Sequence, residues 1–290
     1  MYQNNLQAEF DTDLPMINLG GTMVGNGATN WSYDVWPTFP ATLANMKIIQ
    51  KSLLDDWEAQ GCNAYFHNVR PYTDTPECKA MAKRMMDLSG ELNWYDLYRK
   101  NYDLNMVSAE DRMGETVIGG KTRTYRRGMT MAEYTPFAPQ HVLDSPSAQA
   151  VNGDFLTDYM NREDVRAALN IPEDVQTWEM CSNTLRYNVQ DEASYWIYPI
   201  LRNKTKLMFY SGDTDGAITT YGSKMWIKSL GWPVKDAWRP WYTDGQVSGY
   251  TETYDGLQFV TVKGVGHMAP QWARKPVTDM IMAHVHGEEF

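Results

Sequence analysis

Short apolar runs bounded by turn residues predict the strands of a sheet. Residues 14–24 predict a strand that ends in the turn Gly25-Asn-Gly27, and residues 206–210 predict a short buried strand. Residues 237–264 alternate in polarity and are rich in Trp, Tyr, Val and Thr, which predicts strands joined by tight turns. These turns fall at Asp244-Gly245 and Asp255-Gly256.

Apolar residues at helical spacing alternate with these strands. They predict helices over residues 52–60, 77–88, 161–170, about 220–230 and about 276–287. Ser52 and Asn161 are the predicted caps of the first and third of these helices. Met81, Met85 and Leu88 form a stripe that predicts packing rather than function. Helices that alternate with strands favour an α/β fold with a parallel sheet.

The middle of the chain has no clear period. Residues 105–150 contain the basic run Lys121–Arg127, for which an exposed loop is the favoured interpretation and a proteolytic processing site at Arg126-Arg127 the alternative. We therefore expect three parts. Residues 1–30 hold the first strand and turn, 31–150 a helical and loop-rich insertion, and 151–290 the rest of the core.

Composition narrows the class of protein. A net charge of -10 over 290 residues argues against binding to nucleic acid or to an anionic membrane surface, because both carry the same sign of charge. With 11 Trp and 18 Tyr, the chain is typical of folded proteins. No apolar window is long enough for a membrane span, and no secretion signal is visible in the first 30 residues. We expect no cofactor.

Three cysteines and two sequons suggest an extracellular type of protein. Cys62 and Cys78 flank a polar stretch that a disulfide between them can close, and this leaves Cys181 without a partner. Asn30 and Asn203 each begin an Asn-x-Ser/Thr sequon, so both are glycosylation candidates. These features without a secretion signal lead us to expect that an upstream segment is missing.

Two loops carry the candidate chemistry. Asp215 follows the buried strand 206–210, and His267 follows the last strand. Functional groups of α/β sheets gather at the carboxyl ends of strands, and α/β-hydrolases run in the order Ser, Asp, His. An imidazole accepts the proton of a serine nucleophile, and a carboxylate fixes and stabilises that imidazole. Asp215 is the predicted acid and Asp213 a structural residue of the loop.

Two other patterns have ordinary explanations. His284 and His286 lie near a helix end and lack carboxylates at ligand spacing other than Glu288 and Glu289, so a metal site there is disfavoured. The Trp-rich stretch 226–241 is explained better by hairpin packing than by sugar stacking.

Seven blocks of sequence point to one family. They are Ile17–Gly27, Leu92–Tyr98, Tyr159–Leu169, Trp178–Ser182, Tyr210–Asp215, Gly245–Tyr250 and Gly264–Pro270. In this order they resemble the serine carboxypeptidases, the lysosomal, vacuolar and secreted α/β-hydrolases that include cathepsin A. The resemblance covers roughly residues 14–287 of this chain and the later part of the family's own length. It implies an incomplete α/β-hydrolase fold.

The resemblance assigns roles to named residues. It implies that Asp215 is the triad acid, that His267 is the base and that Met268 lines the pocket for the substrate's C-terminal side chain. Members of the family remove single residues from the C-termini of peptides through an acyl-enzyme. The resemblance also implies a lysosomal, vacuolar or secreted location.

The departures from the family are as large as the matches. No Gly-x-Ser-x-Gly elbow occurs in the sequence, so the nucleophile is absent. The family's Trp-Asn-Gly-Gly-Pro-Gly-Cys segment is absent too, and with it an oxyanion-hole amide and the family's partner for Cys181.

Whether this molecule is an enzyme therefore stays open. Under the first hypothesis, the chain is the C-terminal part of a serine carboxypeptidase and is inactive alone. It binds a peptide substrate once the N-terminal part completes the active site. The alternative is a non-catalytic binding or assembly subunit. In that case a partner chain covers the first strand, which would otherwise be an exposed apolar sheet edge.

Overall fold

The chain folds into two compact units. The computed structural model describes residues 5, 15–35, 37–62, 75–90, 92–99, 113–118, 121–126, 154–179 and 193–290. One unit combines residues 1–98 with 189–290, and the other contains residues 99–188. Residues 31–98, which we expected in an insertion, thus belong to the same compact unit as the sheet.

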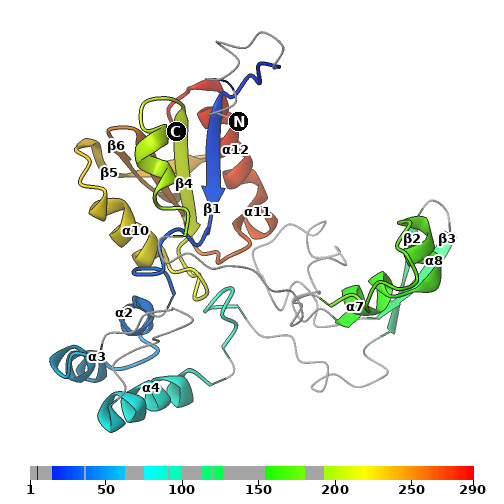
Figure 1. The fold of residues 1–290 in the computed structure, drawn as a ribbon, viewed down its shortest axis with the longest axis horizontal. Helices are drawn as coiled ribbons and strands as arrows, with labels where there is room; N and C mark the ends of the chain where they lie inside the picture. Colours follow the sequence, from blue (N-terminus) through cyan, green and yellow to red (C-terminus); the bar gives the residue numbers. More distant parts are fainter. Residues whose placement is uncertain are drawn as a thin grey trace. The chain divides into compact units, whose positions relative to one another are not determined.

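The first unit contains a sheet flanked by helices (Figure 1). Its strands are β1 (Gly21–Gly25), β4 (Lys206–Gly212), β5 (Val234–Thr243), β6 (Gln246–Tyr254) and β7 (Leu257–Val262). Its helices are α2 (Phe39–Asn45), α3 (Lys51–Ala59), α4 (Pro76–Ser89), α9 (Ile197–Leu201), α10 (Thr220–Ser229), α11 (Ala269–Trp272) and α12 (Arg274–His286). The second unit contains β2 (Met113–Ile118), β3 (Lys121–Arg126), α7 (Asp154–Met160) and α8 (Glu163–Ala168).

The sheet is mixed, with the strand order β1-β4-β7-β6-β5. β1 runs parallel to β4, and β4 runs parallel to β7. β6 pairs antiparallel with both β7 and β5. The expected parallel sheet is therefore limited to three strands. The two predicted turns reverse the chain, and positive φ angles at Asp244, Gly245 and Gly256 allow these reversals.

Alternate residues of β4 bury into two separate cores. Phe209 packs on Trp226 of α10 with 5.1 Å between ring centroids, and both side chains are fully buried. Met208, which points to the other face, packs with Val277 and Met280 of α12. The period of two along the strand thus places α10 and α12 on opposite faces (Figure 1). Both faces of this strand are covered, as its continuous apolar run predicts.

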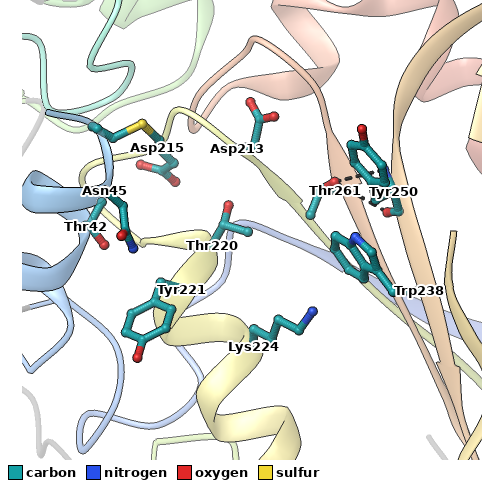
Figure 2. Close-up of a pocket in the computed structure, with 11 residues that line it drawn as sticks. Thr42, Asn45, Asp213, Asp215, Thr220, Tyr221, Lys224, Trp238, Tyr250 and Thr261 are labelled. Carbon is teal, nitrogen blue, oxygen red and sulfur yellow. Dashed lines mark hydrogen bonds between the residues drawn. The ribbon is translucent and has the colours of Figure 1, made fainter. Parts of the chain in front are cut away.

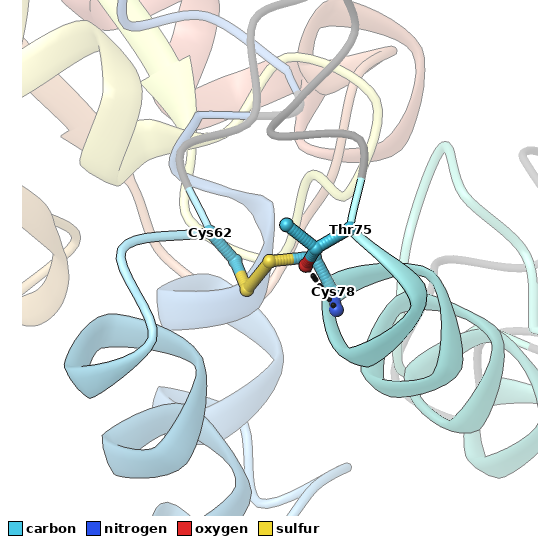
Figure 3. Close-up of a disulfide and its surroundings, with 3 residues drawn as sticks. All are labelled: Cys62, Thr75 and Cys78. Carbon is cyan, nitrogen blue, oxygen red and sulfur yellow. Dashed lines mark hydrogen bonds between the residues drawn. A yellow bond between two sulfur atoms is a disulfide. The ribbon is translucent and has the colours of Figure 1, made fainter.

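A third core lies among α2, α3 and α4. Its buried residues include Leu43, Leu53, Trp57 and Met85. Cys62 and Cys78, the pair that the sequence indicated, are themselves buried in this core and form a disulfide (Figure 3). Thr75 caps α4 by accepting a hydrogen bond from the Cys78 N–H at 3.2 Å, so the cap and the disulfide fix the same helix start.

Two predicted helix caps were wrong. Ser52 lies inside α3, whose N-cap is Gln50. α8 is shorter than predicted, and its N-cap is Arg162 instead of Asn161. The Asn161 amide pairs with the backbone of Trp178, accepting from its N–H at 2.7 Å and donating to its carbonyl at 2.9 Å. A more distant backbone partner therefore replaces the local cap.

Two further expectations need correction. Leu88 is 51% exposed, so the buried stripe of α4 continues through Met85 to Ser89 instead. Lys121–Arg126, expected in a loop, forms β3 and pairs antiparallel with β2. Arg127 lies outside the described residues. Within the described part of the chain, no helix is long and apolar enough to cross a membrane.

Candidate active site

The candidate site begins where β4 and β7 end. Parallel strands end at the same edge of a sheet, so the loops after β4 and β7 meet there. A Cβ added to Gly212 would lie 2.1 Å from the Gly266 carbonyl oxygen, and one added to Gly266 would lie 1.8 Å from the Tyr95 carbonyl oxygen. Both positions need glycine because the backbones approach too closely for any side chain.

This close approach brings the two predicted residues together. The Nδ1 atom of His267 lies 2.8 Å from Oδ2 of Asp215. Asp215 is 1% exposed, whereas about 31% of the His267 side chain is exposed. A buried carboxylate thus orients an imidazole that stays accessible to a reactant.

Several hydrogen-bond donors surround the Asp215 carboxyl group. Its Oδ1 atom accepts hydrogen bonds from the N–H groups of Ala217 at 2.8 Å and Ile218 at 3.2 Å. Its Oδ2 atom accepts from Nδ2 of Asn26 at 2.7 Å. Burial raises the pKa of Asp215, while the contacts with His267 and Asn26 act in the opposite direction. The donors offset part of the cost of burying the charge.

Asp213, in the same loop, connects two loops of the site. Its Oδ1 atom accepts a hydrogen bond from the Gly264 N–H at 2.7 Å, which ties the acid loop to the loop that carries His267. Burial raises the pKa of Asp213 to about 6. The structure therefore brings Asp215 rather than Asp213 to the imidazole.

Residues 93–98 lie across both loops, a feature that the sequence analysis missed. The contacts are Leu97 N to Thr214 O at 2.9 Å, Gly216 N to Trp94 O at 2.9 Å, His267 N to Tyr95 O at 2.6 Å and Thr214 Oγ1 to Asp96 Oδ1 at 2.7 Å. The Tyr95 ring also lies 5.4 Å from the His267 ring, centroid to centroid. Three of these bonds join backbone atoms only, so no side-chain pattern signals them.

A pocket of about 290 Å³ lies beside the acid loop. Its lining includes both Asp213 and Asp215 and, below them in the view of Figure 2, Lys224 and Trp238. The Lys224 ammonium lies 3.7 Å from the centre of the Trp238 ring, and Trp238 stacks on Tyr250. Burial lowers the pKa of Lys224. The pocket thus joins the acid loop to an aromatic surface on β5 and β6.

The other candidate residues fall in distinct places. Met268, half-buried, is the N-cap residue of α11 directly after His267. Asn30 is buried and accepts a hydrogen bond from the Ser32 N–H at 3.0 Å, whereas Asn203 is exposed. Cys181 lies outside the described residues. Among the described residues, no three His, Cys, Asp or Glu side chains form a group that could hold a metal ion.

The geometry suits one type of chemistry. A carboxylate bonded to Nδ1 fixes the proton on that nitrogen, which leaves Nε2 as the atom that accepts a proton from a nucleophile. An imidazole held in this way can act as a general base and then as a general acid.

Comparisons with known proteins point to one family. The family model for serine carboxypeptidases matches residues 2–287. Serine carboxypeptidase-like 21 of Arabidopsis thaliana is 29% identical over 298 residues, which cover 95% of this chain and 59% of that protein. Serine carboxypeptidase 1 of Hordeum vulgare is 30% identical over 280 residues, which cover 89% of this chain and 54% of that protein.

A solved structure shows the fold. The prohormone-processing carboxypeptidase Kex1(delta)p from Saccharomyces cerevisiae superimposes with a TM-score of 0.56 at 16% identity, over 99% of this chain and 58% of that one. The chain thus spans a little over half the length of the proteins it matches. It has an α/β-hydrolase type of fold and belongs to the serine carboxypeptidase family.

Proposed function

We propose that this chain supplies the acid and the base of a serine carboxypeptidase triad. Asp215 is the acid and His267 is the base, and the reaction releases C-terminal residues from peptides. The observation that carries the proposal is the contact of 2.8 Å between His267 Nδ1 and Asp215 Oδ2, made at the carboxyl ends of two parallel strands.

The pair performs two proton transfers in each half of the reaction. Nε2 of His267 takes the serine Oγ proton while the Oγ–C bond forms at the scissile carbonyl, and returns that proton to the leaving amine as the C–N bond breaks. In the second half, Nε2 takes a proton from the water that attacks the acyl carbonyl, and returns it to the serine Oγ as the ester C–Oγ bond breaks and the shortened peptide leaves. Throughout, the Asp215 carboxylate stabilises the imidazolium that forms at each transfer.

The nucleophile lies outside this sequence in our proposal. No Gly-x-Ser-x-Gly elbow occurs between residues 1 and 290, and neither does the family's oxyanion segment. Without a serine and without an oxyanion hole, most of the rate enhancement of such an enzyme is lost. We therefore expect this chain alone to be inactive and to act once a serine-bearing segment completes the site.

A non-catalytic binding or assembly subunit is the second candidate. The observation that favours it is the uncharged edge strand β1, where Met23 is 37% exposed, together with the segment before it, where Met16 and Ile17 are 63% and 38% exposed. A partner that pairs with this edge satisfies its backbone groups and covers these side chains. In such a protein the contact between Asp215 and His267 is retained without catalysis.

Three finer assignments follow from the family proposal. Met268, next to the base, contacts the substrate's C-terminal side chain. The disulfide between Cys62 and Cys78 supports a secreted, vacuolar or lysosomal location, because disulfides persist in oxidising compartments. Asn203 is the better glycosylation site, because its side chain is exposed and that of Asn30 is buried.

Active-site labelling separates the two candidates. The native protein is treated with a fluorophosphonate and mapped by mass spectrometry under non-reducing conditions, with a His267→Ala variant as the matched control. A labelled serine that depends on His267 supports the carboxypeptidase. A native protein that takes no label, and keeps its partner after His267→Ala, refutes it and supports the assembly subunit.

A further inference from the structure

We infer that Asn26 is a positioning residue for the triad acid, an inference that rests on the proposed roles of Asp215 and His267. Asn26 is the first residue after β1 and is 3% exposed. Its side-chain hydrogen bonds join it to the Asp215 carboxylate and to the Gly212 N–H, and neither bond involves His267. It acts through Asp215.

The backbone of Asn26 is shaped for this contact. Its φ of +45° lies in the left-handed region, which asparagine tolerates better than most residues. Its N–H donates to the Tyr210 carbonyl oxygen at 2.9 Å, which extends the pairing of β1 with β4 by one bond. The side chain therefore leaves the strand end on a fixed backbone.

Both the oxygen and the nitrogen of the Asn26 side-chain amide form hydrogen bonds. Its Oδ1 atom accepts from the Gly212 N–H at 3.2 Å, and its Nδ2 atom donates to Asp215 Oδ2 at 2.7 Å. The amide thus joins the end of β4 to the carboxylate three residues later. An aspartate here would keep the acceptor but lose the donor, so the Gly212 contact alone does not explain asparagine.

The Asn26 donor limits how the carboxylate can turn. Asp215 Oδ2 takes hydrogen bonds from both Asn26 and His267, while Oδ1 takes the two backbone N–H groups of the loop. With its two oxygens held from different directions, the carboxylate keeps one lone-pair direction toward Nδ1. A hydrogen bond to a charged acceptor of this kind is shorter and stronger than one between neutral groups. Asn26 therefore helps to fix the imidazole tautomer that a general base requires.

The tautomer of His267 is the direct readout. In the full chain, ¹⁵N chemical shifts of neutral His267 give the ratio of the Nδ1–H to the Nε2–H form, with His267→Gln to assign the signals. We expect Asn26→Asp and Asn26→Gly to lower this ratio by roughly fivefold, since either change removes the donor to Oδ2. Asn161→Asp is the matched control, because the Asn161 amide bonds to Thr157 and Trp178 and not to the triad. It should leave the ratio unchanged.

The two variants also separate positioning from folding. Asn26→Asp keeps an acceptor for the Gly212 N–H, and Asn26→Gly keeps the left-handed backbone accessible. Should Asn26→Gly unfold, Asn26→Asp decides the question. If the folded variants keep the wild-type ratio of the two tautomers, the inference is overturned, and the role of Asn26 is limited to connecting the ends of β1 and β4. The readout needs no nucleophile, so a failed fluorophosphonate experiment does not affect it.

Discussion

The two edge strands of the central sheet, β1 and β5, differ in composition and in the regularity of their pairing. β5 carries Lys235, Asp236 and Arg239, and Pro240 removes one backbone donor. Its pairing with β6 is interrupted by register shifts. β1 has the sequence Gly-Thr-Met-Val-Gly, with no charge and no proline, and its register with β4 is unbroken. Charges, proline and bulges prevent edges from pairing with other chains.

This difference bears on what covers β1. β5 has the features of a finished edge, and its charged groups find partners, as in the contact of 2.6 Å between Lys235 and Asp255. β1 has the composition of an interior strand, although β4 is its only paired neighbour among the described residues. The contrast supports our proposal that further chain, from this protein or from a partner, lies against β1.

The largest expected effect separates the centre of the sheet from its bare edge. Phe209→Ala, in the fully buried middle of β4, should lower the free energy of unfolding by about 3–5 kcal/mol, because it leaves a cavity against Trp226. Met23→Ala, on the half-exposed β1, should cost less than about 1 kcal/mol. Urea unfolding of the full chain measures both. Equal losses would show that β1 is as tightly packed as the centre.

A charge placed on each edge sharpens the comparison. Met23→Lys should weaken self-association of the chain by roughly tenfold, because it adds to β1 the kind of residue that protects β5. Ala237→Lys, on the exposed part of β5, is the matched control and should have little effect. Sedimentation at several protein concentrations gives both association constants. If both substitutions act alike, net charge and not the edge controls association.

The sequence predicted the elements whose structure depends on residues close together in the chain. The apolar run of β4 needs two covered faces, and the Asp-Gly turns need positive φ, so β4 and both hairpin turns were placed correctly. The first strand, predicted over residues 14–24, is limited to Gly21–Gly25, and β2 and β3 were missed. The order of Asp215 and His267 along the chain also placed them at the ends of neighbouring strands. The strand and the turns each depend on residues within a few positions of one another, whereas the order of Asp215 and His267 predicts their meeting only together with an α/β-hydrolase fold.

The remaining features depend on contacts between distant residues. The bond from Asn26 to Asp215 spans 189 positions, and nothing near Asn26 signals it except its place at a strand end. Three of the four hydrogen bonds from residues 93–98 to the two loops join backbone atoms, which every sequence has. The predicted cap at Asn161 was wrong because Trp178, 17 residues away, offers both a donor and an acceptor. Here a hydrogen-bond partner far away in the sequence replaced the helix cap that the local sequence predicted.

The smallest expected effect is a change in stability with pH, and it compares the buried loop after β4 with the exposed strand β5. Burial raises the pKa of Asp213 from 3.8 to about 6, so between these pH values the folded chain binds more protons than the unfolded chain. The free energy of unfolding therefore falls as pH rises through this window, by on the order of 1–2 kcal/mol from this group.

Buried Asp34, whose pKa burial also raises to about 6, contributes with the same sign. Asp213→Asn keeps an acceptor for the Gly264 N–H and should reduce the difference in stability between pH 4 and pH 7 without abolishing it. Asp236→Asn, at an exposed position of β5, should leave that difference unchanged. Thermal unfolding across this pH range measures all three proteins. An unchanged difference in Asp213→Asn would mean that Asp213 is ionised throughout, and that the tie between the two active-site loops does not depend on pH.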